Sequence, residues 1–120
     1  MEQPEAEKYF SCFRLECEKS MKIANLYDPD SELCRLNRSA STAPFKCSES
    51  LYNLLKKCRK AWIHSEGAFD ISAKKLMDIW GFYRKRQNKM PAPQEIRNVL
   101  QKTGLEKVIF DDNERTVFSQ

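Results

Sequence analysis

The sequence has few of the residues from which compact catalytic sites are usually built. It contains only three glycines and one histidine among 120 residues. A phosphate loop is excluded, because such loops need several closely spaced glycines around the phosphates. A Ser-His-Asp or Cys-His site would have to be built around His64, where no second catalytic partner is evident. As a self-contained enzyme the chain is therefore expected to be incomplete.

Long hydrophobic runs and a leader-like opening are missing as well. No apolar stretch approaches the roughly 18 residues that a membrane-spanning helix needs. The opening, MEQPEAEKYF, is polar and acidic and has no apolar signal core. The sequence predicts a soluble chain that carries no signal or anchor, cytoplasmic as given.

The five cysteines form no CxxC pair, and with a single histidine they do not support a zinc site. We expect reduced thiols packed as small hydrophobic side chains, which favours a reducing compartment. The cysteines are Cys12, Cys17, Cys34, Cys47 and Cys58.

The net charge of +4 comes from 21 basic and 17 acidic residues, so most of the charge is mixed. KKCRK at 56–60 is expected on the solvated face of a helix, and RKRQNK at 84–89 in a loop. A nucleic-acid protein more often has a stronger basic bias with interleaved aromatics. Nucleic-acid binding is a low third option, and it would use Arg84, Lys85, Arg86 and Lys89.

Hydrophobic periodicity predicts a long first helix over about residues 4–25, beginning at Pro4. Its apolar stripe is expected to be a core face, made of Phe10, Phe13, Cys17, Met21 and Ala24. One or two helical turns should follow the Asp28–Pro29 start, with Leu33 and Leu36 inward. Capping and helix-dipole compensation explain the acidic residues here better than calcium, since the glycine and spacing of a calcium loop are missing.

After a small-residue loop at 38–47, Ser48 is predicted to cap a strong amphipathic helix that ends near Gly67. Its apolar stripe consists of Leu51, Leu54, Leu55, Cys58 and Trp62. His64 is expected to be a surface residue in the last turn. A short helix should cover about residues 71–80, before a basic loop at 81–93.

The final helix is predicted to begin at Pro93 and to stop at Gly104, with Ile96, Val99 and Leu100 inward. KVIFDDNERTVFS reads as two strands joined by a polar turn. The fold class is therefore α+β, with several helices packed on a small antiparallel sheet and a C-terminal β-hairpin. An isolated β-hairpin is only marginally stable in water, and its edges are open to pairing with other strands. Residues 1–120 are therefore expected to form one partial domain, which belongs to a larger α+β layer.

Two stretches have features of a binding site. In SEGAFD, Gly67 and Ala68 remove side-chain bulk, so a flat ligand could lie against the backbone. Asp70 can cap the next helix or accept hydrogen bonds from a ligand. In NLYDPDSELCRLN, Tyr27 stands at a helix exit, where its ring can be exposed for stacking. Without further information, these residues are better explained as helix caps and turns than as ligand contacts, because helix caps are common.

Three segments of the chain resemble motifs of the FAD:protein FMN transferases, the ApbE family formerly labelled thiamine-biosynthesis lipoproteins. In chain order, these segments are YDPDSELCRLN, GAFDISAKKLMDIWGF and KTGLEKVIF. The resemblance covers roughly residues 10–119, in the family's order and spacing. It implies the front half of a larger ApbE-like, T-fold-like domain. Such proteins split FAD with a divalent metal, usually magnesium, and attach FMN to a threonine hydroxyl of a target flavoprotein.

Carried over by the same resemblance, Tyr27 matches the aromatic residue that stacks on the isoalloxazine ring. The FAD-contacting GAFD segment falls on Ala68, Phe69 and Asp70. Site-shaping residues of the SELxRLN motif fall on Ser31, Glu32 and Asn37.

The chain departs from the family pattern near the expected flavin. Cys34 replaces a serine, which is a mild change. The family's T-V-G-P becomes Ser72, Ala73, Lys74 and Lys75. The two lysines either meet flavin phosphates or mark a relaxed, non-functional site.

The family's opening M-G-T strand and its later glycine-rich, phosphate-binding and metal-binding segments have no counterpart here. Magnesium is implied by the family, but its ligands are missing from this sequence, and no catalytic residue is assigned. We expect no turnover by the chain alone, and weak or absent FAD binding unless a second polypeptide or a dimer partner completes the site. Family members are often exported and membrane-anchored, whereas this chain carries no anchor. The alternative is a non-catalytic truncated descendant that acts as a flavin-binding or protein-interaction module.

Overall fold

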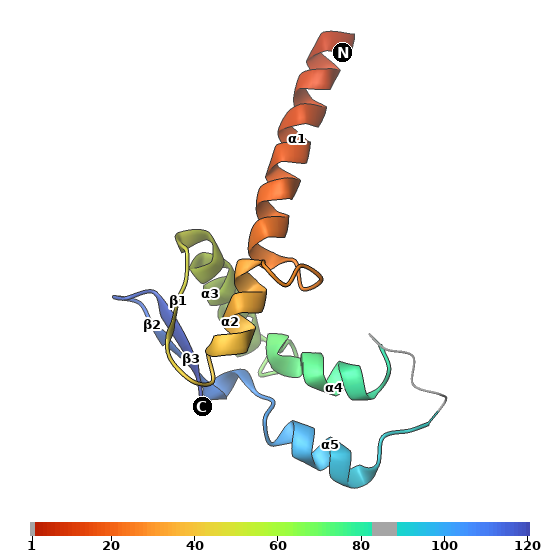
Figure 1. The fold of residues 1–120 in the computed structure, drawn as a ribbon, viewed down its shortest axis with the longest axis vertical. Coiled ribbons are helices and arrows are strands. Elements are labelled where there is room, and N and C mark those ends of the chain that lie inside the picture. Colours follow the sequence, from red (N-terminus) through yellow and green to blue (C-terminus); the bar gives the residue numbers. More distant parts are fainter. Residues whose placement is uncertain (1, 83–88) are drawn as a thin grey trace. The chain divides into compact units, whose positions relative to one another are not determined.

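The computed structural model describes residues 2–82 and 89–120. It has the predicted α+β class, with helices, a small antiparallel sheet and a C-terminal hairpin (Figure 1). The helices are α1 (Gln3–Ala24), α2 (Glu32–Ser39), α3 (Glu49–His64), α4 (Lys74–Ile79) and α5 (Pro93–Leu100). The short helices are η1 (Ile71–Ala73) and η2 (Leu105–Lys107), and the strands are β1 (Phe45–Lys46), β2 (Val108–Asp111) and β3 (Thr116–Ser119).

The chain divides into two compact units. The first contains residues 2–52 and 110–118, and the second contains residues 53–109 and 119–120. Whether the whole chain acts as one partial domain stays a prediction. No helix in the described parts of the chain is long and apolar enough to cross a membrane.

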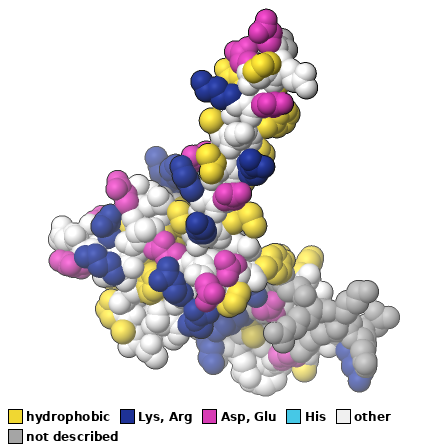
Figure 2. Space-filling view, turned by 45° about the horizontal axis from the view of Figure 1, so that its top comes forward, with side chains coloured by type: hydrophobic (Ala, Val, Ile, Leu, Met, Phe, Trp, Pro, Cys, Tyr) yellow, Lys and Arg dark blue, Asp and Glu magenta, His cyan; other side chains and the backbone are white. Residues whose placement is uncertain are grey.

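In the first unit, α1 has the predicted extent but not the predicted burial. Pro4 stands in its first turn, and no residue of the helix is buried. Phe10 is 73% exposed, Phe13 68% and Met21 56%. Hydrophobic side chains accordingly lie at the surface of α1 among charged ones (Figure 2). The prediction of a core face is wrong here, because periodicity identifies an apolar stripe but not the surface that covers it.

The second helix begins at a different cap from the predicted one. Asp28 and Pro29 form a turn, in which the Asp28 carboxylate accepts a hydrogen bond from the Asp30 N–H. Ser31 is the residue that caps α2, since its hydroxyl accepts the Cys34 N–H at 3.2 Å. Leu36 is buried as predicted. The helix lies beside the C-terminal end of α1 (Figure 1).

The sheet has the order β1-β3-β2. β1 lies inside the segment predicted as a loop, and it pairs antiparallel with β3 through Phe45 and Val117. A two-residue strand carries no readable periodicity, so only the pairing with a distant segment reveals it. Val117 is buried, with Leu36, Ala40, Cys47, Leu51 and Tyr52, in the core of the first unit.

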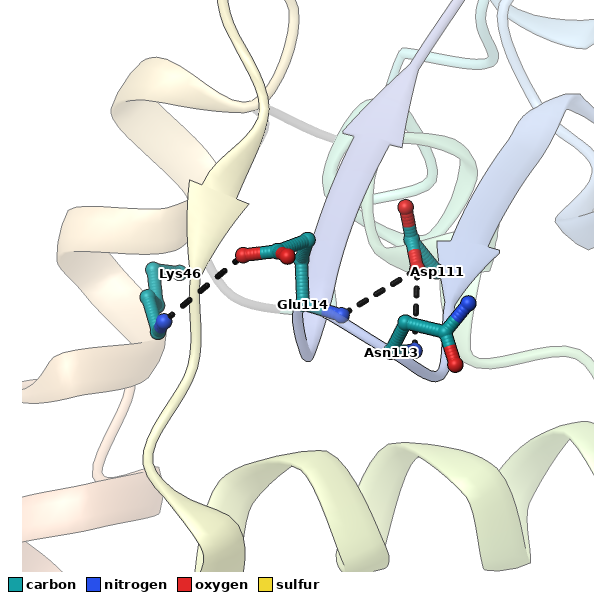
Figure 3. Close-up of polar contacts among 4 residues, drawn as sticks. All are labelled: Lys46, Asp111, Asn113 and Glu114. Carbon is teal, nitrogen blue, oxygen red and sulfur yellow. Dashed lines mark hydrogen bonds and ion pairs between the residues drawn. The ribbon is translucent and has the colours of Figure 1, made fainter.

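The hairpin turn between β2 and β3 is held by its own side chains (Figure 3). The Asp111 carboxylate accepts the backbone N–H groups of Asn113 at 2.9 Å and Glu114 at 3.2 Å. Lys46 and Glu114 form an ion pair at 4.0 Å, with both side chains about two-thirds exposed. Such exposed pairs contribute little, so the Asx-type turn is the main local support of the hairpin.

The thiol of Cys47 and the hydroxyl of Tyr52 are both buried in the first unit, and we expect them to make the protein less stable at alkaline pH. Burial, with a contribution from the Glu32 carboxylate, raises the pKa of Cys47 from 9.0 to about 11. Burial and the Asp112 carboxylate, which accepts the Tyr52 hydroxyl at 2.5 Å, raise the pKa of Tyr52 from 10.0 to about 12. The folded state favours the neutral forms, so their stabilisation is complete below about pH 9 and declines as the pH rises toward 12.

We expect the free energy of unfolding, measured by urea titration at successive pH values, to fall between pH 9 and 12. Tyr52→Phe should remove part of that fall, whereas Tyr9→Phe, at a side chain that is 60% exposed, should follow the wild type. If the free energy of unfolding did not change up to pH 12, the conclusion that the Cys47 thiol and the Tyr52 hydroxyl are buried in their neutral forms would be contradicted.

The second unit contains most of α3 and the helices that follow it. α4 and α5 pack against each other and run side by side (Figure 1). Leu55 and Leu105 are buried, but Leu54 is 42% and Leu100 49% exposed. The prediction that Leu100 points inward is therefore wrong, since this short helix buries only part of its apolar stripe. The basic cluster at 84–89 lies outside the described residues except for Lys89, which is exposed.

Candidate functional site

Tyr27 lies in the turn between α1 and α2, in the first unit. Its backbone N–H donates to the Asn25 side-chain oxygen at 3.0 Å. The side chain itself is 84% exposed, so the ring is available for stacking. The sequence prediction of an exposed ring at a helix exit is confirmed, while its contact with a flavin stays a prediction.

Ser31 and Glu32, from the SELxRLN motif, are buried and hold the first unit together. Ser31 is 1% exposed, and its hydroxyl donates to the Asn25 carbonyl at 2.7 Å while it caps α2. Glu32 accepts both the Ser48 N–H at 2.5 Å and the Ser48 hydroxyl at 2.6 Å. Asn37, by contrast, is exposed on α2. These contacts give Ser31 and Glu32 a positioning role at the starts of α2 and α3.

Ser48 was predicted as the cap of α3, and its hydroxyl does accept the Leu51 N–H at 3.2 Å. The sequence did not reveal that Glu32 in turn binds Ser48 from 16 residues away. A helix N-terminus has unsatisfied N–H groups and a favourable field for a carboxylate. Glu32 therefore completes the cap from a distant part of the first unit.

The corner that follows α3, Gly67–Asp70, lies in the second unit between α3 and α4 (Figure 1). Glu66 has φ +53° and Gly67 φ +85°, so the chain turns through the left-handed region. A Cβ at Gly67 would make only an ordinary van der Waals contact, 3.6 Å from the Trp62 ring nitrogen, so the positive φ is what favours glycine here. The predicted helix stop is confirmed, and Gly67 and Ala68 are both exposed residues.

The backbone donors of the corner are used internally. The Gly67 N–H donates to the Trp62 carbonyl at 2.9 Å, and the Ala68 N–H to the Ser65 carbonyl at 3.1 Å. The Phe69 N–H donates to the Ser65 hydroxyl at 2.9 Å. The Phe69 side chain is 47% exposed. The corner therefore presents a half-exposed aromatic ring over a backbone whose N–H groups are already satisfied.

Asp70 and Ser72 connect this corner to the turn before η2. One Asp70 oxygen accepts the Ser72 N–H at 2.8 Å and the Ser72 hydroxyl at 2.6 Å. The other accepts the Leu105 N–H at 3.2 Å, and the Ser72 oxygen accepts the Gly104 N–H at 2.8 Å. We call these four residues the corner clamp. Asp70 thus caps η1, as predicted, and binds a second segment that the sequence did not reveal.

Gly104 is required by the corner clamp for a backbone reason. Its φ is +136°, which side chains of L-residues rarely adopt, whereas the Glu106 carboxylate beside it could move away from an added Cβ. Only glycine adopts such a conformation without strain. The sequence prediction assigned Gly104 a helix stop, but α5 already ends at Leu100. The sequence indicated that the chain turns at Gly104, whereas the hydrogen bond from the Gly104 N–H to the Ser72 hydroxyl depends on the tertiary fold.

The two lysines at the departure from the family pattern have different surroundings. Lys74 donates to Asp78 at 3.0 Å within α4. Lys75 is exposed. Lys74 is therefore engaged along its own helix, and Lys75 is the more accessible cation after the corner.

The predicted site residues fall into both units. Tyr27, Ser31, Glu32 and Asn37 belong to the first, and Ala68, Phe69 and Asp70 belong to the second. Within the units, the structure brings Ser31 and Glu32 together at the start of α2, and Asp70 to Gly104 and Leu105. The joint action of Tyr27 and the corner stays a prediction.

The carboxylates of the predicted site are engaged in contacts within the protein. Nowhere in residues 2–82 and 89–120 do three His, Cys, Asp or Glu side chains come together as a metal site would require. Glu32 and Asp70 use both carboxylate oxygens in hydrogen bonds to the protein.

Comparison with known proteins gives a consistent result. The profile of the ApbE family matches residues 7–120. The FAD:protein FMN transferase of Salmonella typhimurium is 32% identical over 99 residues, covering 82% of this chain and 28% of the relative. That of Escherichia coli K12 is 30% identical over 86 residues, covering 71% of this chain and 24% of the relative.

Solved structures agree with the sequence relatives. The flavin transferase ApbE of Vibrio cholerae has a TM-score of 0.79 at 25% identity, and covers 99% of this chain. The ApbE protein of Thermotoga maritima has a TM-score of 0.72 at 28% identity, and covers 82%. This chain spans 37% and 31% of those structures, and about a quarter of the curated relatives.

Proposed function

Because the chain belongs to the ApbE family, we propose that it forms the flavin-binding part of an FAD:protein FMN transferase. Such an enzyme transfers FMN from FAD to a threonine hydroxyl of a target flavoprotein. The observation that carries the proposal is the family match over residues 7–120, which includes both Tyr27 and the Gly67–Asp70 corner. The 84% exposure of Tyr27 supports a stacking role for its ring.

The chain alone is proposed to bind FAD weakly and not to turn it over. Phosphoryl transfer with magnesium needs the cation to neutralise charge on the pyrophosphate. The described residues offer no cluster that would hold such an ion. In this proposal, a polypeptide with the remainder of the family fold supplies the metal and the bond-breaking groups.

Binding is tested with the purified chain and FAD, by flavin fluorescence and by the melting temperature of the protein. A ligand that binds only the folded state raises the melting temperature by mass action. We expect Tyr27→Ala to weaken binding about tenfold, which corresponds to one lost stacking contact. Tyr9→Ala is the matched control, because Tyr9 is also an exposed tyrosine, at 60%. No binding with or without magnesium would reject the proposal for this chain.

Turnover is tested separately with FAD, magnesium and a threonine-containing flavoprotein target. The expected result is no covalent flavin on the target, measured by in-gel fluorescence and mass spectrometry. Labelling by the chain alone would show that it is catalytically complete and would overturn the second half of the proposal.

A further inference from the structure

The turn between α1 and α2, which carries Tyr27, is held by side chains of α2 and of its cap (Figure 1). On the side of the turn that precedes Tyr27, the Ser31 hydroxyl donates to the Asn25 carbonyl at 2.7 Å. The Cys34 thiol donates to the Leu26 carbonyl, with 3.4 Å between sulfur and oxygen. The backbone immediately before Tyr27 is therefore fixed to the start of α2.

The same helix also holds the turn on the side that follows Tyr27. The Arg38 guanidinium donates through Nη1 to the Pro29 carbonyl at 2.7 Å. The proline ring restricts this part of the backbone further, because it fixes φ. Ser31, Cys34 and Arg38 are spaced by three and four residues, so they lie on one face of α2. We call these three residues the α2 donors.

The ring of Tyr27 is free although the backbone on both sides of it is held. Its side chain is 84% exposed, so packing against the protein does little to fix the direction of the ring. The Tyr27 N–H donates to the Asn25 side-chain oxygen at 3.0 Å, which adds a local turn contact. The direction in which the ring leaves the chain is thus set by the conformation of the turn.

We infer that the α2 donors are positioning residues for the stacking of Tyr27 on the flavin. A ligand that stacks on a ring whose backbone is already ordered loses less conformational entropy on binding. Cys34 and Arg38 contribute to this order through carbonyl groups of the turn and need no contact with the ligand. The inference rests on the proposed function, and it adds residues that act on the ligand only through Tyr27.

Cys34 and Arg38 are the residues to replace, because Ser31 also caps α2. A thiol is a weak donor, and the Arg38 side chain belongs to an exposed residue, so each hydrogen bond is expected to have a modest effect. Cys34→Ala and Arg38→Ala should each weaken FAD binding about threefold. The double variant should lose about tenfold, which is the loss expected for Tyr27→Ala.

A double-mutant cycle tests whether these effects pass through the ring. In a chain that already carries Tyr27→Ala, Cys34→Ala and Arg38→Ala should change FAD binding by less than about twofold, because no ring is left to position. Cys34→Ser keeps a donor and should bind FAD within about twofold of the wild type. Cys17→Ala and Arg14→Ala are the matched controls, at exposed residues of α1.

Riboflavin separates positioning from a direct contact with phosphate. An arginine can bind a phosphate group itself, and FAD has a pyrophosphate whereas riboflavin has none. If Arg38 acts through Tyr27, Arg38→Ala should weaken riboflavin binding by the same factor as FAD binding. The ¹⁵N order parameter of the Tyr27 amide, measured without ligand, should fall in the double variant from about 0.85 toward about 0.6. Circular dichroism of each variant checks that the chain is folded.

The outcomes separate this inference from the proposed function. A wild-type chain that binds neither FAD nor riboflavin rejects the proposed function and this inference with it. A chain that binds flavin contradicts the inference alone if Arg38→Ala weakens only FAD, or if Cys34→Ala and Arg38→Ala cost as much without the Tyr27 ring as with it. An unchanged order parameter of the Tyr27 amide in the double variant contradicts it as well.

Discussion

Replacing Asp70 with alanine is expected to destabilise the protein by about 3 kcal/mol, the sum of a lost helix cap and of hydrogen bonds to a charged acceptor. The Ser72 N–H, the Ser72 hydroxyl and the Leu105 N–H would all lose their acceptor. The measurement is urea unfolding followed by far-UV circular dichroism. Amide exchange at Gly104 and Leu105 should become faster in the variant.

The control for this prediction is Asp78→Ala on the neighbouring helix α4. Asp78 pairs with Lys74 at 3.0 Å, but both side chains are more than a third exposed. An exposed pair at this spacing contributes about 0.5 kcal/mol. If the two aspartate variants had equal stability, the corner clamp would not be a stabilising contact.

Ser72→Ala, combined with Asp70→Ala, tests whether the corner clamp acts as a unit. The two residues share a hydrogen bond at 2.6 Å, and both contact the Gly104–Leu105 turn. Their separate losses should therefore not add, and the double variant should be more stable than additivity predicts by about 1 kcal/mol.

Replacing Glu32 with alanine, in a separate variant, is expected to lower the free energy of unfolding by a similar amount, about 3 kcal/mol. Glu32 is 9% exposed and is the acceptor for both donors of Ser48. Without it, the start of α3 loses a carboxylate, and two polar groups at the edge of the core lose their partner. Urea unfolding of the variant should show the loss directly, and Glu32→Gln should recover part of it.

Glu49→Ala is the matched control, because Glu49 is the exposed acidic residue in the first turn of the same helix. Its interaction with the helix dipole is worth less than about 1 kcal/mol. A loss in Glu49→Ala as large as in Glu32→Ala would assign the effect to the helix dipole and not to the contact between Glu32 and Ser48.

Much of the fold was readable from the sequence because its signals are local. Pro4 and Pro93 mark helix starts, Ser48 caps α3, and Gly67 turns the chain after it. Each of these signals acts within about one helical turn, so the neighbouring residues suffice to interpret it. The hairpin was predicted for the same reason, since alternation and a polar turn lie within one short segment.

The failures came where the outcome depends on what lies opposite a residue. The stripe of α1 has the period of a core face, yet Phe10 and Phe13 are exposed. β1 is too short for a pattern and exists through its pairing with β3. For the same reason, the predicted role of Asp70 as a ligand acceptor did not take account of Leu105, which lies 35 residues further along the chain.

The sequence by itself determined the class of the fold, the positions of its main helices and hairpin, and the family to which the chain belongs. Those properties reside in short motifs and periodicities, including SELCRLN and GAFD. Only the tertiary structure decided what Glu32 and Asp70 bind. Their partners lie 16 and 35 residues away, and a hydrogen bond between such distant groups depends on the path of the whole intervening chain.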